Sequence, residues 1–279
     1  MLILRKFTLF AMACAAYFIA GCAVNPITGE EELMFFPETQ DIEIGKAYAP
    51  EVEKELKGRI EDQILQNYVD SVGGKIARIS HRPDFAYLFV AVNDKSINAV
   101  ALPGGKIFIT KGMLLKMKSE AQLASVLAHE TVHVVARDTA NSMSKQIGID
   151  ILFAAAASQT SSQGAIVMAD LARQIVALRY SRDDERDADI YGMDYLVRAG
   201  YNPNAAVETM QMLEQEERIR AVEFLSSHPS PENRVSYLQA RVQSHYFNSI
   251  EGTKIGEEDY QRFVLDRLKN LPDVPEKKT

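Results

Sequence analysis

Apolar and polar positions along the chain follow a helical period over most of its length. The pattern predicts a series of helices: 37–56, 61–79, one opened by Ser119, 171–199, one opened by Asn202-Pro203 and one opened by Ser230-Pro231. Ser119 with Gln122 three residues later has the pattern of a capping box. Adjacent glycines at positions 73 and 74 weaken the second helical pattern.

A different pattern occupies the stretch between the second and third helices. Runs rich in β-branched and aromatic residues predict strands over 85–92, 97–102 and 106–110. The sequence Pro103-Gly104-Gly105 predicts a tight turn, so we expect a hairpin between the last two strands. Together the patterns predict a mostly helical α+β fold, with a small β-sheet packed beside one helix.

The stretch from 139 to 170 leaves two alternatives open. Ile147 to Ala157 is apolar, but eleven residues cannot span a membrane. We expect either a buried helix, or a mobile lid or membrane-facing loop.

The first 21 residues resemble a bacterial lipoprotein signal. Arg5 and Lys6 precede an apolar run, and small residues stand directly before Cys22. The resemblance implies that Cys22 is acylated and that residues 22–36 form a tether; an uncleaved signal anchor is the alternative. Ala23 is not the aspartate that retains lipoproteins at the inner membrane, so the expected location is the outer membrane facing the periplasm.

The amino-acid composition excludes several classes of protein. The 279 residues are 47% hydrophobic and 25% charged, which excludes a disordered polymer and a disulfide-rich miniprotein. The net charge of −7 provides no electrostatic footprint for nucleic acid. Of the two cysteines, Cys14 belongs to the expected signal and Cys22 to the expected anchor, so we expect no disulfide.

Chemistry is concentrated in the helix after Ser119. His129, Glu130 and His133 form the pattern H-E-x-x-H, which places both imidazoles on one helix face with the glutamate beside them. Such a pair binds one Zn²⁺, and the glutamate can take a proton from the attacking water. The alternative is a solvated polar helix face, but apolar flanks predict a buried helix, where unpaired imidazoles are costly.

A catalytic zinc site normally has a third protein ligand. No histidine occurs between 134 and 139, so a carboxylate from the acidic segment 183–189 is the candidate. Glu185 and Asp189 are one helical turn apart, but spacing alone does not select Glu185 among the neighbouring acids.

H-E-x-x-H followed by S-R-x-x-E-x-x-A-D over 181–189 resembles the HtpX/CAAX-prenyl-protease family of gluzincin metallopeptidases, closest to its BepA- and LoiP-like envelope branch. Three further segments are similar to that branch: 25–29 (N-P-x-T-G), 98–105, and His228-Pro229-Ser230 with Arg234. The resemblance implies a zincin-like metallopeptidase domain over 37–245 and a C-terminal extension over 246–279. It also implies that Glu185 is the third zinc ligand and that Asp189 accepts the outer N–H of a zinc histidine.

The implied mechanism is hydrolysis of a peptide bond at one zinc ion held by His129, His133 and Glu185, with Glu130 as the general base. His228 and Arg234 are candidates for stabilising the oxyanion. His228 has two alternatives, a capping or surface residue and a fourth zinc ligand that holds the enzyme shut. For Arg234 the alternative role is that of a partner in a structural salt bridge.

Substrate binding is expected along the strand Asn98, Ala99, Val100 and Ala101, because an exposed strand edge binds extended peptides through main-chain hydrogen bonds. The alternative is an interior strand. The expected function is an envelope endopeptidase acting on misfolded or misassembled envelope proteins. The competing function is a metal-binding, chaperone-like lipoprotein without significant turnover.

Overall fold

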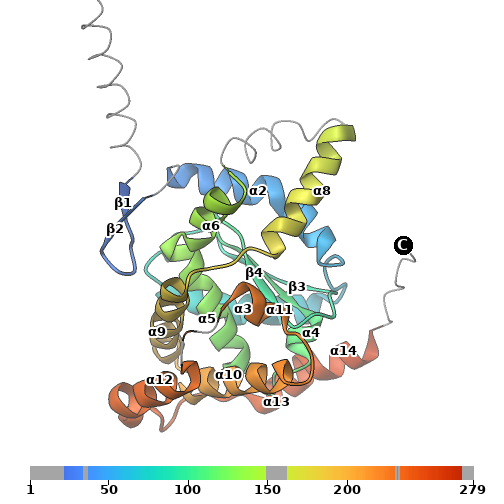
Figure 1. The fold of residues 1–279 in the computed structure, drawn as a ribbon. Helices are drawn as coiled ribbons and strands as arrows, with labels where there is room; N and C mark the ends of the chain where they lie inside the picture. Colours follow the sequence, from blue (N-terminus) through green and yellow to red (C-terminus); the bar gives the residue numbers. More distant parts are fainter. Residues whose placement is uncertain (1–21, 34–36, 149–161, 230, 232, 272–279) are drawn as a thin grey trace, which may run out of the picture.

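The computed structural model describes residues 22–33, 37–148, 162–229, 231 and 233–271. Helices pack around a small three-stranded sheet, and the fully buried helix α5 runs through the middle (Figure 1). This architecture confirms the expected mostly helical α+β fold. The expected signal at 1–21 and most of the ambiguous apolar run, 149–157, lie outside the described residues.

Helices account for most of the described elements. They are α2 Glu38–Glu55, α3 Gln63–Ile79, α4 Lys111–Leu114, α5 Glu120–Ala136, α6 Asp138–Gln146, α8 Ser162–Val176, α9 Arg182–Arg198, α10 Asn204–Glu217, α11 Glu223–Ser227, α12 Arg234–Arg241, α13 Glu257–Tyr260 and α14 Asp266–Asn270. The predicted helices over 37–56 and 61–79 are confirmed by α2 and α3. Among the described residues, no helix has both the length and the apolar character needed to cross a bilayer.

The sheet contains β3 Leu88–Val92, β4 Ala99–Ala101 and β5 Lys106–Thr110 in the order β3-β5-β4. The predicted hairpin is confirmed, because β4 and β5 pair antiparallel with Ala101 opposite Ile107. β3 pairs with β5 in parallel. Within the described residues β4 therefore lies at an edge of the sheet and not in its interior.

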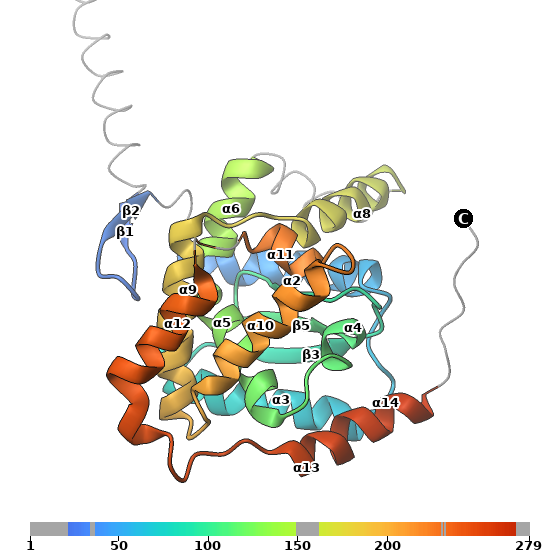
Figure 2. The same ribbon diagram turned by 60° about the horizontal axis from the view of Figure 1, so that its bottom comes forward.

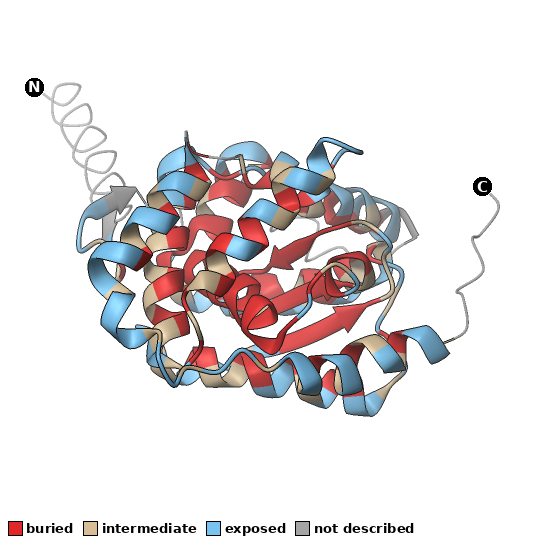
Figure 3. Ribbon diagram, turned by 90° about the horizontal axis from the view of Figure 1, so that it is seen from below, coloured by how far each residue is buried: buried red, intermediate tan, exposed pale blue. Residues whose placement is uncertain are grey.

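Both faces of the sheet are covered, and the two faces belong to different apolar clusters. Phe89 and Ile107 contribute to a cluster shared with α3, α5, α9 and α10, whereas Val90 and Phe108 contribute to one shared with α2, α6 and α8. Figure 3 shows the strands and α5 buried together. The sheet is thus a central layer, and α5 lies against one of its faces.

The prediction of one long helix over 171–199 is wrong. α8 ends at Val176 and α9 begins at Arg182, where Ser181 and Asp184 form a complete capping box. Between the two helices, the Tyr180 N–H donates to the carbonyl of Ser227. Local side-chain capping and this long-range backbone bond therefore end a run that helical periodicity alone would continue.

Two later helices, α10 and α12, begin within a few residues of the predicted positions. α10 begins at Asn204 rather than at Pro203, and the side chain of Asn202 accepts from the Asn204 N–H. The helix expected at Ser230-Pro231 begins at Arg234, directly after Asn233 in the left-handed region with φ of 60°. Ser230 itself lies outside the described residues.

The two ends of the described chain pack against the core. Residues 22–33, expected as a tether, form a hairpin of β1 Cys22–Val24 and β2 Glu31–Leu33, and the Ile27 side chain at its tip is buried. At the other end the helical segment 257–270, which contains α13 and α14, runs beside α3, as Figure 2 shows, and its middle part, Gln261–Leu265, contacts α3. The Tyr260 hydroxyl donates to the carbonyl of Leu114.

The two adjacent glycines of α3 differ in their surroundings. A Cβ atom at Gly73 would lie 2.3 Å from Cγ of Phe89, whereas a Cβ at Gly74 would meet its nearest atom, Nη1 of Arg78, at 3.7 Å. Gly73 thus allows α3 to pack directly on β3, and Gly74 has no such role.

We expect Gly73→Ala to lower the free energy of unfolding by about 1–3 kcal/mol, because the added methyl overpacks the contact with Phe89. Gly74→Ala is the matched control and should be neutral or stabilising by up to about 1 kcal/mol, because alanine favours the helix. Urea unfolding measures both. Equal effects of the two substitutions would contradict the packing argument.

Candidate metal centre

The metal-binding pattern lies on the central helix. His129, Glu130 and His133 are all buried on α5, whose start is capped by the Ser119 side chain accepting from the Gln122 N–H. The Gln122 side chain accepts from the Lys118 N–H rather than from Ser119, so the expected capping box is only half formed. The flanking apolar residues pack the helix into the core, and this packing buries the two imidazoles.

A second helix brings in the acidic residues. α9 packs closely against α5, because a Cβ at Gly192 would already lie 3.2 Å from the backbone nitrogen of His129. This close approach places Glu185, which is fully buried, opposite the two histidines. Among the acids of this segment, Glu185 is the one whose carboxylate reaches both imidazoles.

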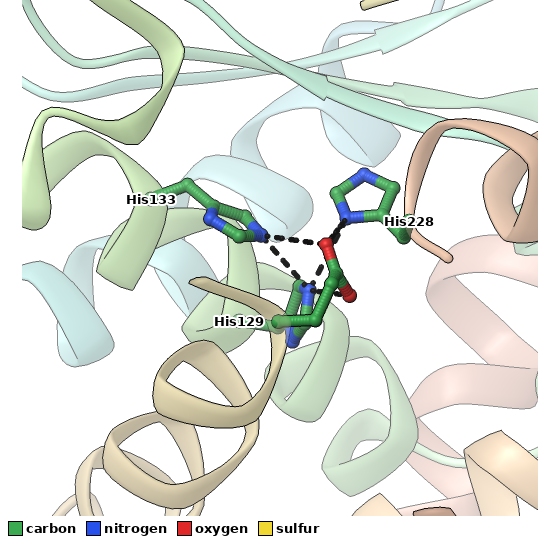
Figure 4. A group of neighbouring side chains, drawn as sticks. His129, His133 and His228 are labelled. Carbon is green, nitrogen blue, oxygen red and sulfur yellow. Dashed lines mark hydrogen bonds and ion pairs between the residues drawn. The ribbon is translucent and has the colours of Figure 1, made fainter. Parts of the chain in front are cut away.

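Four side chains, those of His129, His133, Glu185 and His228, each place one potential ligand atom within 4.8 Å of the others. Figure 4 shows the three imidazoles turned toward one another. The Nε2 atoms of His129 and His133 are 3.1 Å apart. Glu185 Oε1 lies 3.4 Å from Nε2 of His133, and Oε2 lies 3.4 Å from Nε2 of His129. His228 Nδ1 lies 2.8 Å from Glu185 Oε1 and 3.3 Å from His129 Nε2.

The outer nitrogens of the two α5 histidines face carboxylates. His129 Nδ1 lies 3.1 Å from Asp189 Oδ1, and His133 Nδ1 lies 2.8 Å from Asp138 Oδ2. An N–H donated outward leaves each Nε2 lone pair directed into the cluster, as a metal ligand requires. Asp138 was not predicted from the sequence; its signal is its position five residues after His133, at the start of the next helix.

Arg234 lies behind the carboxylates. Its Nε and Nη2 donate to the two oxygens of Asp189 at 2.7 and 2.6 Å, and Nη2 lies 3.2 Å from Glu185 Oε2. Tyr237 also donates to Asp189. Arg234 therefore forms a buried salt bridge that orients Glu185 and Asp189. Its role in stabilising the oxyanion stays a prediction.

Electrostatics keep the carboxylates ionised. Burial raises the pKa of Glu185, but the neighbouring His228 and His129 outweigh that effect and hold it well below its usual value. Burial likewise raises the pKa of Asp189, but Arg234 and His129 together outweigh burial and lower this pKa below its usual value. An ionised Glu185 can act as a metal ligand and an ionised Asp189 as a hydrogen-bond acceptor.

The residues present fit a zinc ion. Imidazole nitrogens and a carboxylate are the ligands that catalytic zinc prefers. Both oxygens of Glu130 are buried without a hydrogen-bond partner within the part of the chain that the structure describes. Buried acceptors without partners are costly, and a cation with its water would satisfy them. The chemistry of the site therefore matches a metal centre.

The expected substrate strand borders this site. Phe224, whose ring stacks on His228 at a centroid distance of 4.2 Å, donates its N–H to the carbonyl of Ile97, just before β4. Asn98 uses its side-chain oxygen to accept from the Ala99 N–H. At the start of β4, the carbonyl of Ile97 and the N–H of Ala99 are therefore already hydrogen-bonded within the chain in this conformation.

Comparison with known proteins supports the geometry. The profile of peptidase family M48 matches residues 63–242. The mitochondrial metalloendopeptidase OMA1 of Schizosaccharomyces pombe is 30% identical over 208 residues, covering 71% of this chain and 61% of that protein. The beta-barrel assembly-enhancing proteases of Yersinia pestis and Escherichia coli are 29% and 28% identical, over 66% and 73% of this chain. This chain spans 40% and 44% of their lengths.

Metal removal should destabilise the protein. We expect a chelator to lower the melting temperature and zinc to restore it, since a ligand at about 100 times its Kd stabilises by about 2.7 kcal/mol. His133→Ala should abolish the zinc-dependent shift, whereas His245→Ala, at an exposed histidine, should retain it. Differential scanning calorimetry measures both. A zinc-dependent shift that survives His133→Ala would contradict the assigned site.

Proposed function

The chain belongs to peptidase family M48, and we propose that it is a zinc-dependent endopeptidase, anchored to the bacterial envelope by a lipid on Cys22, that hydrolyses misfolded or misassembled envelope proteins. Family membership confirms the resemblance drawn from the motifs. The chain covers less than two thirds of the relatives compared above, so its activity and substrates are proposals.

The observation that carries this proposal is the state of Glu130. The carboxylate is fully buried, and neither oxygen has a hydrogen-bond partner among the described residues. His228 lies beside it, with Nε2 3.5 Å from Oε1. A site that only holds a metal does not need a buried carboxylate with free lone pairs, whereas a general base does.

The roles of the side chains follow from their positions. Bound zinc would supply a Lewis acid that polarises the scissile carbonyl and acidifies the attacking water. His129, His133 and Glu185 would hold it, and Asp189 would orient His129. Glu130 takes the proton of the attacking water on a carboxylate oxygen and gives it to the leaving amine.

His228 fits a fourth ligand better than a surface or capping residue. Its imidazole is buried, and Nδ1 lies among the other ligand atoms. A fourth protein ligand occupies the position that a catalytic site leaves open for water, so His228 must withdraw before the reaction. After withdrawal its N–H remains available to the oxyanion, which keeps the expected second role.

Substrates are proposed to bind along β4, from Asn98 to Ala101. This strand forms one edge of the sheet, and a peptide added to it would form main-chain hydrogen bonds that do not depend on sequence. Unfolded chains offer such extended segments, which supports misfolded proteins as the substrate class.

The proposed location rests on the leader sequence and on the relatives. Cys22 is the first residue of β1, and the residues before it have the pattern of a lipoprotein signal. Two of the relatives are beta-barrel assembly-enhancing proteases, a name that supports an envelope role. We propose an outer-membrane anchor with the site facing the periplasm. The alternative function is a metal-binding, chaperone-like lipoprotein without turnover.

Glu130→Gln tests the general base. We expect cleavage of casein to fall by at least about 100-fold, because the amide cannot accept the proton, while zinc binding is retained. Glu258→Gln, at an exposed acid on α13, is the control and should cleave at the wild-type rate. Undiminished cleavage by Glu130→Gln would reject the mechanism, and zinc-loaded wild-type protein that binds casein without cutting it would establish the alternative.

His228→Ala tests the fourth ligand. We expect the casein-cleavage rate to rise several-fold, because the substitution opens the coordination position that His228 occupies. A decrease of about 100-fold or more would instead identify oxyanion stabilisation as its main role. The zinc content of both proteins, measured in parallel, separates these outcomes from loss of metal.

A further inference from the structure

A single residue joins the metal-binding helix to the next one. Arg137 ends α5 and precedes α6 with φ of 65° and ψ of 21°, in the left-handed region that usually requires glycine. A longer side chain at this position costs free energy unless its contacts compensate.

The side chain of Arg137 forms a buried, two-pronged ion pair. Its Nε and Nη2 donate to Oδ2 and Oδ1 of Asp41 on α2, at 2.7 and 2.9 Å. Arg137 is 8% exposed and Asp41 2% exposed. Bidentate geometry fixes the orientation of the guanidinium as well as its position. The unusual backbone conformation is therefore held by a rigid contact with another helix.

The next residue faces the metal site. Asp138 is buried, and its Oδ2 lies 2.8 Å from Nδ1 of His133. A carboxylate there holds the proton on Nδ1 and leaves the Nε2 lone pair for the cluster. Tyr180 stacks on the same imidazole with a centroid distance of 3.9 Å and an interplanar angle of 5°. The orientation of His133 thus depends on where the turn at Arg137 places Asp138.

The helix that supplies Asp41 is itself firmly placed. One turn after Asp41, a Cβ at Gly45 would lie 1.9 Å from the carbonyl oxygen of Pro103, in the turn between β4 and β5. α2 therefore rests directly on the hairpin. Because α2 packs directly on the backbone of the hairpin, the position of Asp41 is fixed relative to Arg137.

We propose that Asp41 and Arg137 are positioning residues for the metal centre, which lock the turn after α5 so that Asp138 holds His133 in its metal-binding orientation. This inference rests on the proposed zinc site. Asp41 and Arg137 are not among the four ligand residues, and we infer that they act through Asp138. We name the pair the α2 clamp.

The test measures the zinc dissociation constant of the full chain by competition with a chromophoric chelator. We expect Asp41→Asn to weaken zinc binding by about 10–100-fold, the effect typical of removing a partner of a ligating histidine. Asp138→Asn should weaken it by a similar factor. Because both act through one contact, the double variant should bind no more weakly than Asp138→Asn alone.

The control removes a different ion pair of the same helix. Glu51 on α2 pairs with Lys54, and Glu51→Gln should leave the zinc dissociation constant unchanged. If Asp41→Asn does not fold, as judged by circular dichroism, the double variant Asp41→Asn with Arg137→Gln removes both charges and keeps a side chain for which positive φ is costly.

Wild-type zinc affinity in the folded Asp41→Asn protein, or in the charge-free double variant, would overturn the α2 clamp and leave the proposed peptidase standing. Fully additive effects of Asp41→Asn and Asp138→Asn would also overturn it, because they would show independent actions. A wild-type chain that binds zinc without cleaving protein would contradict the proposed peptidase function. The zinc dissociation constants of the variants would still test the α2 clamp.

Discussion

Burial of charge at the contact between α5 and α9 is the constraint on which the rest of this structure depends. Imidazoles and carboxylates placed in a core cost several kcal/mol each unless every polar atom has a partner. Arg234 and Asp138 supply such partners from outside the ligand cluster. Among the buried atoms without a hydrogen-bond partner in the described residues, the two oxygens of Glu130 lie at the point where chemistry is proposed.

The arrangement around that contact links the metal site to the proposed substrate strand. Apolar residues of β4 and α5 belong to one core cluster, and Phe224 joins the start of β4 to the ring of His228. The helix α2 lies on the other side, against the turn of the same hairpin. A displacement of the hairpin would therefore reach the ligand cluster through two separate contacts.

The sequence predicted correctly those elements that neighbouring residues determine. The β4–β5 hairpin follows from its turn residues, and the burial of α5 follows from the apolar flanks of H-E-x-x-H. The break at 177–181 was missed because a backbone bond to Ser227, distant in sequence, helps to end the helical run. Spacing did not separate Glu185 from its acidic neighbours, because that choice depends on how α9 packs on α5; the family resemblance supplied it. Asp138 was missed because its role depends on the backbone turn at Arg137.

The most direct test of the central claim is zinc K-edge X-ray absorption spectroscopy on the purified full chain. We expect one zinc per chain with nitrogen and oxygen ligands at about 2.0–2.1 Å, clear imidazole scattering and no sulfur. Glu185→Ala should change this coordination. A chain that retains no stoichiometric zinc, or a zinc spectrum unaffected by Glu185→Ala, would contradict the assignment of the buried cluster as the metal centre.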